Sequence, residues 1–280
     1  MIHLRSVSPK PGSIRGDVER FPFTVPAVRS LESLTFSAPV TFFVGENGSG
    51  KSTVLEGIAA AAGLPAVGST DVRDDATLAA ARLLGSAFRL GWDKRTHRGF
   101  FLRAEDFFGF TKSLARLRAD LNERLREIEL KYADRSAYAR GLAAGPVAAS
   151  LGDMTARYGV DLDASSHGQS FLKLFQNRFV PGGLFLLDEP EAPLSPVSQL
   201  ALIAMMDEMS NQRDAQFIVA THSPLLLALP NATIYSFDQQ PVREVAYDEL
   251  EHVSITREFL NNPARYLRHL TGAGQTLMPA

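Results

Sequence analysis

The chain has 280 residues, of which 45% are hydrophobic and 21% are charged, and its formal net charge is −2. This composition is that of a globular protein with room for one large or two small α/β domains, and it gives no whole-chain signature of nucleic-acid binding. The absence of cysteine excludes disulfides, thiolate metal sites and cysteine nucleophiles, and it fits a reducing compartment.

The N-terminus lacks the apolar core of a secretory signal. No stretch approaches the roughly 18 apolar residues that a membrane helix needs. We therefore expect a cytoplasmic protein without direct membrane insertion, which would act at a membrane only through a partner.

The first part of the chain, residues 1–44, is predicted to form strands and turns. Val40–Val44 is a β-branched and aromatic run without alternation, which is typical of a strand buried on both faces. A helix is predicted over Lys51–Ala62, where Gly63 supplies the stop signal.

The middle of the chain is predicted to be mixed. A helix is expected over 75–84, followed by strands over 87–92 and 99–105. A helical stripe follows at Leu114, Leu117, Leu121, Leu125 and Ile128. Segment 112–140 is mildly basic, with eight Lys/Arg against five Asp/Glu. Segment 141–163 is rich in Ala and Gly, and we expect only a short helix at 152–158.

Three further buried-type strands are predicted in the second half, together with two helices. The strands are Leu184–Leu187, Phe217–Ala220 and Thr233–Phe237, and the first helix is Pro196–Met209. Asn262 and Pro263 are a typical N-cap and first residue of the last helix. Strand–helix alternation predicts an α/β fold with a mostly parallel central sheet. We add to it an antiparallel N-terminal β part and a short helical lid.

A phosphate-binding loop is the strongest motif. Residues Gly45, Glu46, Asn47, Gly48, Ser49, Gly50, Lys51, Ser52 and Thr53 match the P-loop pattern G-x4-G-K-[ST] between a buried strand and a helix. Its glycines let backbone N–H groups and the helix N-terminus face the phosphates of ATP. Lys51 would reach the β- and γ-phosphates, and the hydroxyl of Ser52 would be a ligand of Mg²⁺.

Two carboxylates end the strand Leu184–Leu187. In α/β sheets the carboxyl ends of strands hold ligand groups, so we predict that Asp188 binds Mg²⁺. Glu189 follows, and we predict that it is the general base that acts on the attacking water. These two residues form a Walker B motif.

A weaker motif precedes Walker B. Ser166, Gly168 and Gln169 stand before an apolar helix, and Gln169 precedes Asp188 by 188 − 169 = 19 residues. A serine and a glycine at a helix N-terminus form an anion site. Simple helix capping is the other interpretation.

These motifs together resemble those of ABC-type ATPases. Segment 165–169 is similar to the family's signature, which implies that Ser166, Gly168 and Gln169 contact the ATP held by a second subunit. His222, which ends the strand Phe217–Ala220, resembles the family's switch histidine, whose imidazole hydrogen-bonds the γ-phosphate and the attacking water. Segment 191–196 is similar to the D-loop of RecF-like and OLD-like ATPases, although Ser195 replaces their histidine or aspartate.

The resemblance implies a single ABC-type domain over 1–280, related to RecF and SMC heads, with a helical lid inserted at 106–165. Two functions remain open. The first is an ATPase that dimerises around ATP and acts on DNA or a protein partner, in repair or defence. The second is the nucleotide-binding subunit of a transporter with separate membrane subunits. The D-loop form and the missing Q-loop glutamine favour the first.

Three residues keep two interpretations each. Glu105 either replaces the Q-loop glutamine near Mg²⁺ or is an ordinary surface carboxylate. Phe21 and Phe23 either stack on adenine or pack in the core.

Overall fold

A computed structural model describes residues 1–14, 19–67, 79–158 and 167–270. Its main sheet has six strands in the order β5-β6-β7-β3-β8-β9. The strands are β3 (Val40–Val44), β5 (Gly99–Arg103), β6 (Leu184–Asp188), β7 (Gln216–Ala220), β8 (Thr233–Ser236) and β9 (Arg243–Glu244). The first five are parallel, and β9 pairs antiparallel with β8. The carboxyl ends of β3, β6 and β7 therefore lie side by side at one edge of the sheet.

A second sheet is antiparallel, with the order β2-β1-β4. Its strands are β1 (Leu4–Pro9), β2 (Leu34–Thr35) and β4 (Phe88–Trp92). The predicted combination of a parallel core sheet and an antiparallel N-terminal part is confirmed. Of segment 87–92, which we predicted as a strand, residues 88–92 form β4 of this smaller sheet, and Ala87 ends helix α3 (Ala79–Ala87).

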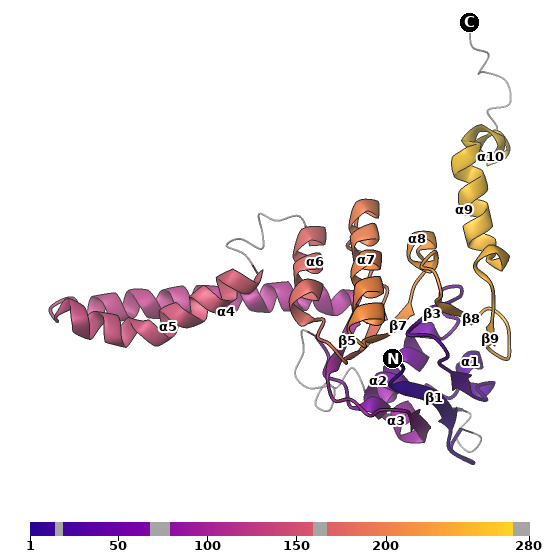
Figure 1. Cartoon of the computed structure of the whole chain (residues 1–280), viewed down its shortest axis with the longest axis horizontal. Helices are drawn as coiled ribbons and strands as arrows, with labels where there is room; N and C mark the ends of the chain where they lie inside the picture. The colour runs from indigo at the N-terminus through magenta and orange to yellow at the C-terminus, as the bar shows by residue number, and fades with distance from the viewer. Residues whose placement is uncertain (15–18, 68–78, 159–166, 271–280) are drawn as a thin grey trace, which may run out of the picture.

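Helices cover both faces of the main sheet (Figure 1). One face packs on α1 (Pro26–Arg29), α2 (Lys51–Ala62) and α3 (Ala79–Ala87). The other face packs on α6 (His167–Arg178), α7 (Pro196–Gln212) and α8 (Pro224–Leu227). Neighbouring residues of one strand enter different cores, as Phe42 and Phe43 do. All residues of β3, β6 and β7 are buried, which explains their non-alternating apolar sequences.

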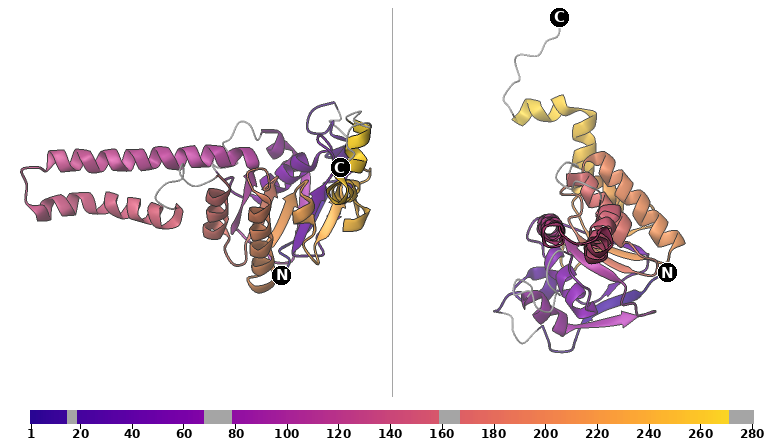
Figure 2. Two further views of the ribbon diagram at one scale, coloured as in Figure 1. Left: turned by 90° about the horizontal axis from the view of Figure 1, so that it is seen from above. Right: turned by 90° about the vertical axis from the view of Figure 1, so that its left-hand side faces the viewer.

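The helical insertion is a two-helix hairpin made of α4 (Ala104–Lys131) and α5 (Ala137–Tyr158). It projects away from the sheet (Figures 1 and 2). At 28 residues α4 is about 42 Å long, so the insertion is a long arm rather than the short lid that we expected. Leu114 and Met154, near its base, are buried against the main core.

The arm differs from the sequence prediction in two places. We expected a strand over 99–105, but β5 ends at Arg103 and α4 begins at Ala104. We expected a short helix at 152–158, but α5 spans 22 residues and includes Pro146. Alanine has the highest helix propensity, and the Ala-rich sequence outweighs the single proline. The apolar stripe that would have marked this helix is missing because its surface is mostly exposed.

Arg103 connects the base of the arm to the P-loop helix. Its guanidinium makes two hydrogen bonds with the carboxylate of Asp106 in α4, at 3.0 and 2.9 Å, and lies 3.6 Å from Glu56 in α2. Arg103 is also the register partner of Asp188 on the neighbouring strand β6.

The C-terminal part adds η2 (Tyr247–Glu249), α9 (Glu251–Asn261) and α10 (Pro263–Leu270). The predicted N-cap is confirmed, because the side chain of Asn262 accepts a hydrogen bond from the backbone N–H of Arg265 at 3.2 Å. Helix α9 had no sequence prediction. Within the described residues, no helix combines the length and the apolar character that a membrane crossing needs.

Candidate functional site

The P-loop joins β3 to α2, and its glycines have backbone angles that other residues rarely adopt. Gly48 and Gly50 have φ values of 84° and 103°. A Cβ atom on Gly50 would lie 2.6 Å from a methyl group of Val25, and one on Gly45 would lie 2.9 Å from Oγ of Ser49. A side chain at Gly45 or Gly50 would therefore clash with neighbouring atoms, and the positive φ values of Gly48 and Gly50 favour glycine.

Lys51, the first residue of α2, folds back on this loop. Its Nζ donates hydrogen bonds to the carbonyl oxygens of Gly45 and Glu46, at 2.6 and 3.1 Å, and the residue is buried. Burial lowers the pKa of Lys51, against the opposite effect of the carboxylates of Glu189 and Asp188. The ammonium group thus lies at the centre of the loop, where an anion would be enclosed.

Ser52 and Asp188 meet although they are far apart in the chain. Oγ of Ser52 donates a hydrogen bond to Oδ1 of Asp188 at 3.0 Å. Burial raises the pKa of Asp188 to about 7, in part opposed by this hydrogen bond. A hydroxyl and a carboxylate are ligands that suit Mg²⁺, which usually keeps several waters and takes the remaining oxygens from phosphates. The described residues contain no cluster of three His, Cys, Asp or Glu side chains that would hold a metal ion alone.

Glu189 and His222 lie at the same sheet edge, after the neighbouring strands β6 and β7. Oε1 of Glu189 is 3.8 Å from Nε2 of His222. Glu189 has φ = 48°, an unusual value for a residue with a side chain, and its N–H donates to the carbonyl of Ala220 at 2.9 Å. Such backbone strain is often found at functional sites. The structure therefore brings together Lys51, Ser52, Asp188, Glu189 and His222.

The signature-like segment is not described to the same extent. Ser166 lies outside the described residues. Gly168 and Gln169 belong to the first turn of α6, and the side chain of Gln169 is not described. The side chain of Glu105, in the first turn of α4, is not described either. The predicted roles of these residues stay predictions.

A cavity of about 230 Å³ adjoins the P-loop. It is lined by Phe21, Asn47, Lys51, Ser52 and Glu189, among others. Phe21 is 56% exposed, whereas Phe23 is 3% exposed and packs in the core. Of the two aromatic candidates, only Phe21 is available to a ligand beside the loop.

Five buried polar atoms in the described part of the chain have no hydrogen-bond partner, and three of them belong to the P-loop or to residues near it. They include Oγ of Ser49 in the P-loop, Nε2 of His222 and Nε2 of His252 on α9. Burial lowers the pKa of His252, and His222 acts in the same direction because it lies nearby. Unsatisfied buried groups are costly, so their presence beside the loop fits a site that accepts a polyanion such as ATP.

Three residues of this neighbourhood were missed by the sequence analysis as site residues. His252 comes from the unpredicted helix α9. Oδ1 of Asp238, just after β8, accepts a hydrogen bond from the N–H of Glu46 at 2.5 Å. Glu191 accepts hydrogen bonds from the turn that holds His222. The rule that ligand groups follow parallel strands would have indicated Asp238, whereas nothing local marks the contacts of Glu191.

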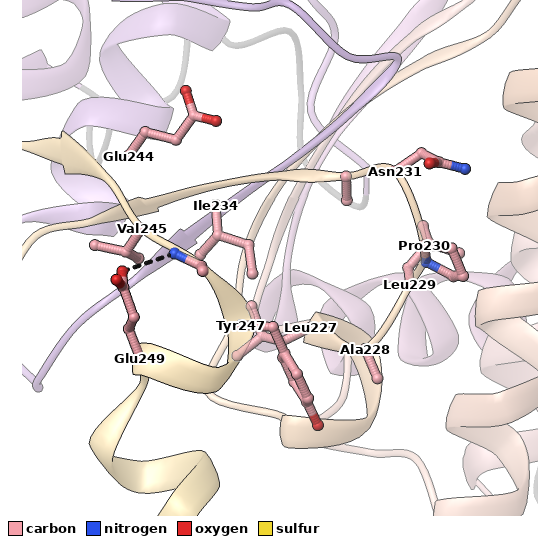
Figure 3. Close-up of a pocket in the computed structure, with 12 residues that line it drawn as sticks. Leu227, Ala228, Leu229, Pro230, Asn231, Ile234, Glu244, Val245, Tyr247 and Glu249 are labelled. Atoms are coloured by element: carbon pink, nitrogen blue, oxygen red, sulfur yellow. Dashed lines mark hydrogen bonds between the residues drawn. The ribbon is translucent and has the colours of Figure 1, made fainter.

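A larger concavity, of about 680 Å³, lies away from the P-loop between α8, β8 and η2 (Figure 3). Its walls include Leu227, Ile234 and Val245. Tyr247 donates to the carbonyl of Pro224 at 3.1 Å, and Glu249 accepts from the N–H of Ala246 at 3.0 Å. The side chains of Tyr247 and Glu249 are therefore hydrogen-bonded to backbone atoms of the protein itself.

Comparisons with known proteins agree with the motifs. Residues 24–82 match a family model described as an AAA domain. Residues 174–228 match a second one, described as an AAA domain, putative AbiEii toxin, Type IV TA system. The two matches contain the P-loop and the Walker B strand respectively. The search of curated proteins found no match.

Solved structures with low identity cover most of the chain. One is an SMC head domain from Thermotoga maritima, with 14% identity over 88% of this chain and 100% of that one, and a TM-score of 0.40. Another is a part of the ABC transporter complex cbiONQ from Clostridium perfringens, with 16% identity over 87% and 92%, and a TM-score of 0.39.

The parallel sheet brings the P-loop, the Walker B carboxylates and the histidine after β7 to one edge. Two AAA domain models match the segments that contain the P-loop and the Walker B strand. The chain thus matches AAA domain models over these two segments, and its motifs resemble those of ABC-type ATPases.

Proposed function

We propose that the chain binds ATP with Mg²⁺ on its P-loop and hydrolyses it. The observation that carries this proposal is the convergence of Lys51, Ser52, Asp188, Glu189 and His222 at the carboxyl ends of three adjacent strands. A purely structural role would not explain the strained backbone at Glu189 or the buried lysine beside two carboxylates.

The P-loop residues bind the triphosphate. The N–H groups of residues 45–53 and the N-terminus of α2 attract phosphate oxygens. Lys51 exchanges its two carbonyl partners for phosphate oxygens, and Ser52 and Asp188 hold the cation. A Mg²⁺ ion held by these two residues would neutralise charge on the phosphates. The exposed ring of Phe21 stacks on the adenine.

Glu189 and His222 act on the attacking water. Glu189 accepts the proton from this water as general base, and its side chain is 43% exposed, so water reaches it. His222 donates a hydrogen bond to the γ-phosphate from Nε2, an atom that has no hydrogen-bond partner in the described part of the chain. The 3.8 Å between Oε1 of Glu189 and Nε2 of His222 lets both groups face the oxygen of the attacking water.

We further propose that ATP closes a head-to-tail dimer. Ser166, Gly168 and Gln169 of one chain then contact the nucleotide on Lys51 of the other. Two exposed apolar residues on the first turns of α7 support a partner surface here, because Val197 and Leu200 are 77% and 55% exposed. Ser195, the D-loop residue, caps α7 through its contact with Ser198 at 3.3 Å.

The dimer is tested with Glu189→Gln, which should bind ATP and hydrolyse it slowly. Light scattering of this variant with ATP and Mg²⁺ should show a dimer, and the same variant with Lys51→Ala added should stay monomeric. Glu208→Gln, at an exposed position of α7, is the matched control. A Glu189→Gln variant that stays monomeric while it holds ATP would rule out the composite site.

We propose that ATP hydrolysis drives an action on DNA or on a protein partner, in repair or defence. The arm gives such a partner a place to bind, and its segment 112–140 carries three more basic than acidic residues (8 − 5). The family description that matches 174–228 names a toxin of a toxin–antitoxin system, which supports the defence side. ATPase rates with and without duplex DNA, together with partner recovery from cells, test this proposal. Recovery of a membrane permease would favour the transporter alternative.

A further inference from the structure

Glu191 links the turn after β6 to the turn after β7. Its Oε1 accepts hydrogen bonds from Oγ1 of Thr221 at 2.7 Å and from the backbone N–H of His222 at 2.8 Å. Thr221 is fully buried. These contacts span 30 and 31 residues of sequence, so they connect the two turns that carry Glu189 and His222.

The contacts of Glu191 form one clamp between these turns, and a second clamp, made by Gln199, joins the same two turns. Oγ of Ser223 donates to Oε1 of Gln199 at 2.6 Å, and Nε2 of Gln199 donates to the carbonyl of Leu194 at 3.2 Å. The N–H of Ser223 donates to Oγ1 of Thr221 at 3.0 Å, which ties the two clamps together. The turn 221–223 is therefore held by side chains from the segment that follows Walker B.

Among the described residues, the hydrogen bonds of the Glu191 carboxylate are with the turn after β7 and not with the P-loop. Its Oε1 is occupied by Thr221 and His222, and its Oε2 is buried without a partner in the described part of the chain. Whatever Glu191 contributes to chemistry must pass through the turn it holds.

We propose that Glu191 is a positioning residue, which fixes Thr221 and His222 so that the imidazole of His222 stays beside the carboxylate of Glu189. Removing its side chain would leave the Thr221 hydroxyl and the His222 N–H without their acceptor in a buried place. The turn would then relax, and misplacement by about 1 Å is enough to slow an enzyme about 10²-fold. This inference rests on the proposed hydrolysis of ATP.

Four variants test it: Glu191→Ala, Glu191→Gln, His222→Ala and the double variant Glu191→Ala/His222→Ala. Glu191→Ala should lower kcat by about 10- to 100-fold and leave KM for ATP within about twofold. Glu191→Gln should recover most of the rate, because its amide oxygen still accepts both hydrogen bonds. Glu208→Ala, which removes an exposed carboxylate from α7, should behave as wild type.

The double variant separates positioning from general stability. If Glu191 acts through His222, removing both side chains should cost little more than His222→Ala alone, within about threefold. A fully additive loss would overturn the proposal, and so would a Glu191→Ala variant with wild-type kcat.

Amide hydrogen exchange of the nucleotide-free protein gives a readout that needs no hydrolysis. The N–H of His222 should exchange at least about 10-fold faster in Glu191→Ala than in wild type, while the buried amides of β7 keep their protection. Unchanged exchange at His222 would overturn the clamp. If the wild type hydrolyses no ATP, the proposed function fails, and the exchange result still decides whether Glu191 holds this turn.

Discussion

Oγ of Ser52 lies 3.0 Å from Oδ1 of Asp188, so the first turn of the P-loop helix is hydrogen-bonded to the end of the Walker B strand. This contact places a hydroxyl and a carboxylate where a cation would bind. It also leaves the carboxylate buried, with a pKa raised to about 7 by desolvation.

The raised pKa of Asp188 predicts a pH-dependent stability of the nucleotide-free protein. An aspartate in the unfolded chain has a pKa near 3.8, so between that value and about 7 the folded protein holds a proton that the unfolded chain has released. Asp188 therefore lowers the free energy of unfolding as pH rises through this window. Asp188→Asn cannot lose this proton.

The measurement is Tm against pH, with a chelator present, for wild type and Asp188→Asn. The Tm advantage of the variant should grow from pH 5 to pH 8. A difference between the two proteins that stays constant over this range would contradict the raised pKa.

Phe21 provides a second prediction, on nucleotide affinity. Stacking of a base on an aromatic side chain contributes about 1–3 kcal/mol, so Phe21→Ala should weaken ATP binding by about 5- to 150-fold. Phe21→Trp should keep the affinity. Tyr138→Ala removes another exposed ring, from the arm, and is the control. Calorimetric titration would refute the stacking role if Phe21→Ala bound ATP as tightly as wild type.

Gly99 provides a third prediction, on stability. It begins β5 with φ = 124°, and a Cβ atom there would lie 1.8 Å from the carbonyl oxygen of Leu184. Gly99→Ala should lower Tm by about 5–10 °C, because the β5–β6 pairing must shift. Gly152→Ala lies in α5 with nothing within 4 Å and should leave Tm unchanged or slightly higher. A Gly99→Ala protein as stable as wild type would show that β5 begins elsewhere.

The central sheet was predictable from sequence because burial on both faces leaves a local signal. The runs that became β3, β6 and β7 contain almost only apolar residues, and the P-loop glycines have no substitute at their φ values. Helix α2 agrees with its prediction at both ends, because a glycine stands before its first residue and Gly63 ends it.

The arm, the choice between Phe21 and Phe23, and the contacts of Glu191 were harder to predict. Helix α5 has no apolar stripe, since an arm exposed to solvent on most sides buries little of either helix. Phe21 and Phe23 are identical residues two positions apart, and only the tertiary fold decides that one is exposed. The partners of Glu191 lie 30 and 31 residues away, beyond any local pattern.

The central claim is hydrolysis at this site, and single-turnover measurement of ATP hydrolysis tests it most directly. Wild type and the Glu208→Gln control should turn over ATP in the presence of Mg²⁺. Glu189→Gln should still bind ATP and hydrolyse it about 10²–10⁴-fold more slowly, and Lys51→Ala should lose binding. A Glu189→Gln protein that binds ATP and hydrolyses it at the wild-type rate would contradict this account of the site.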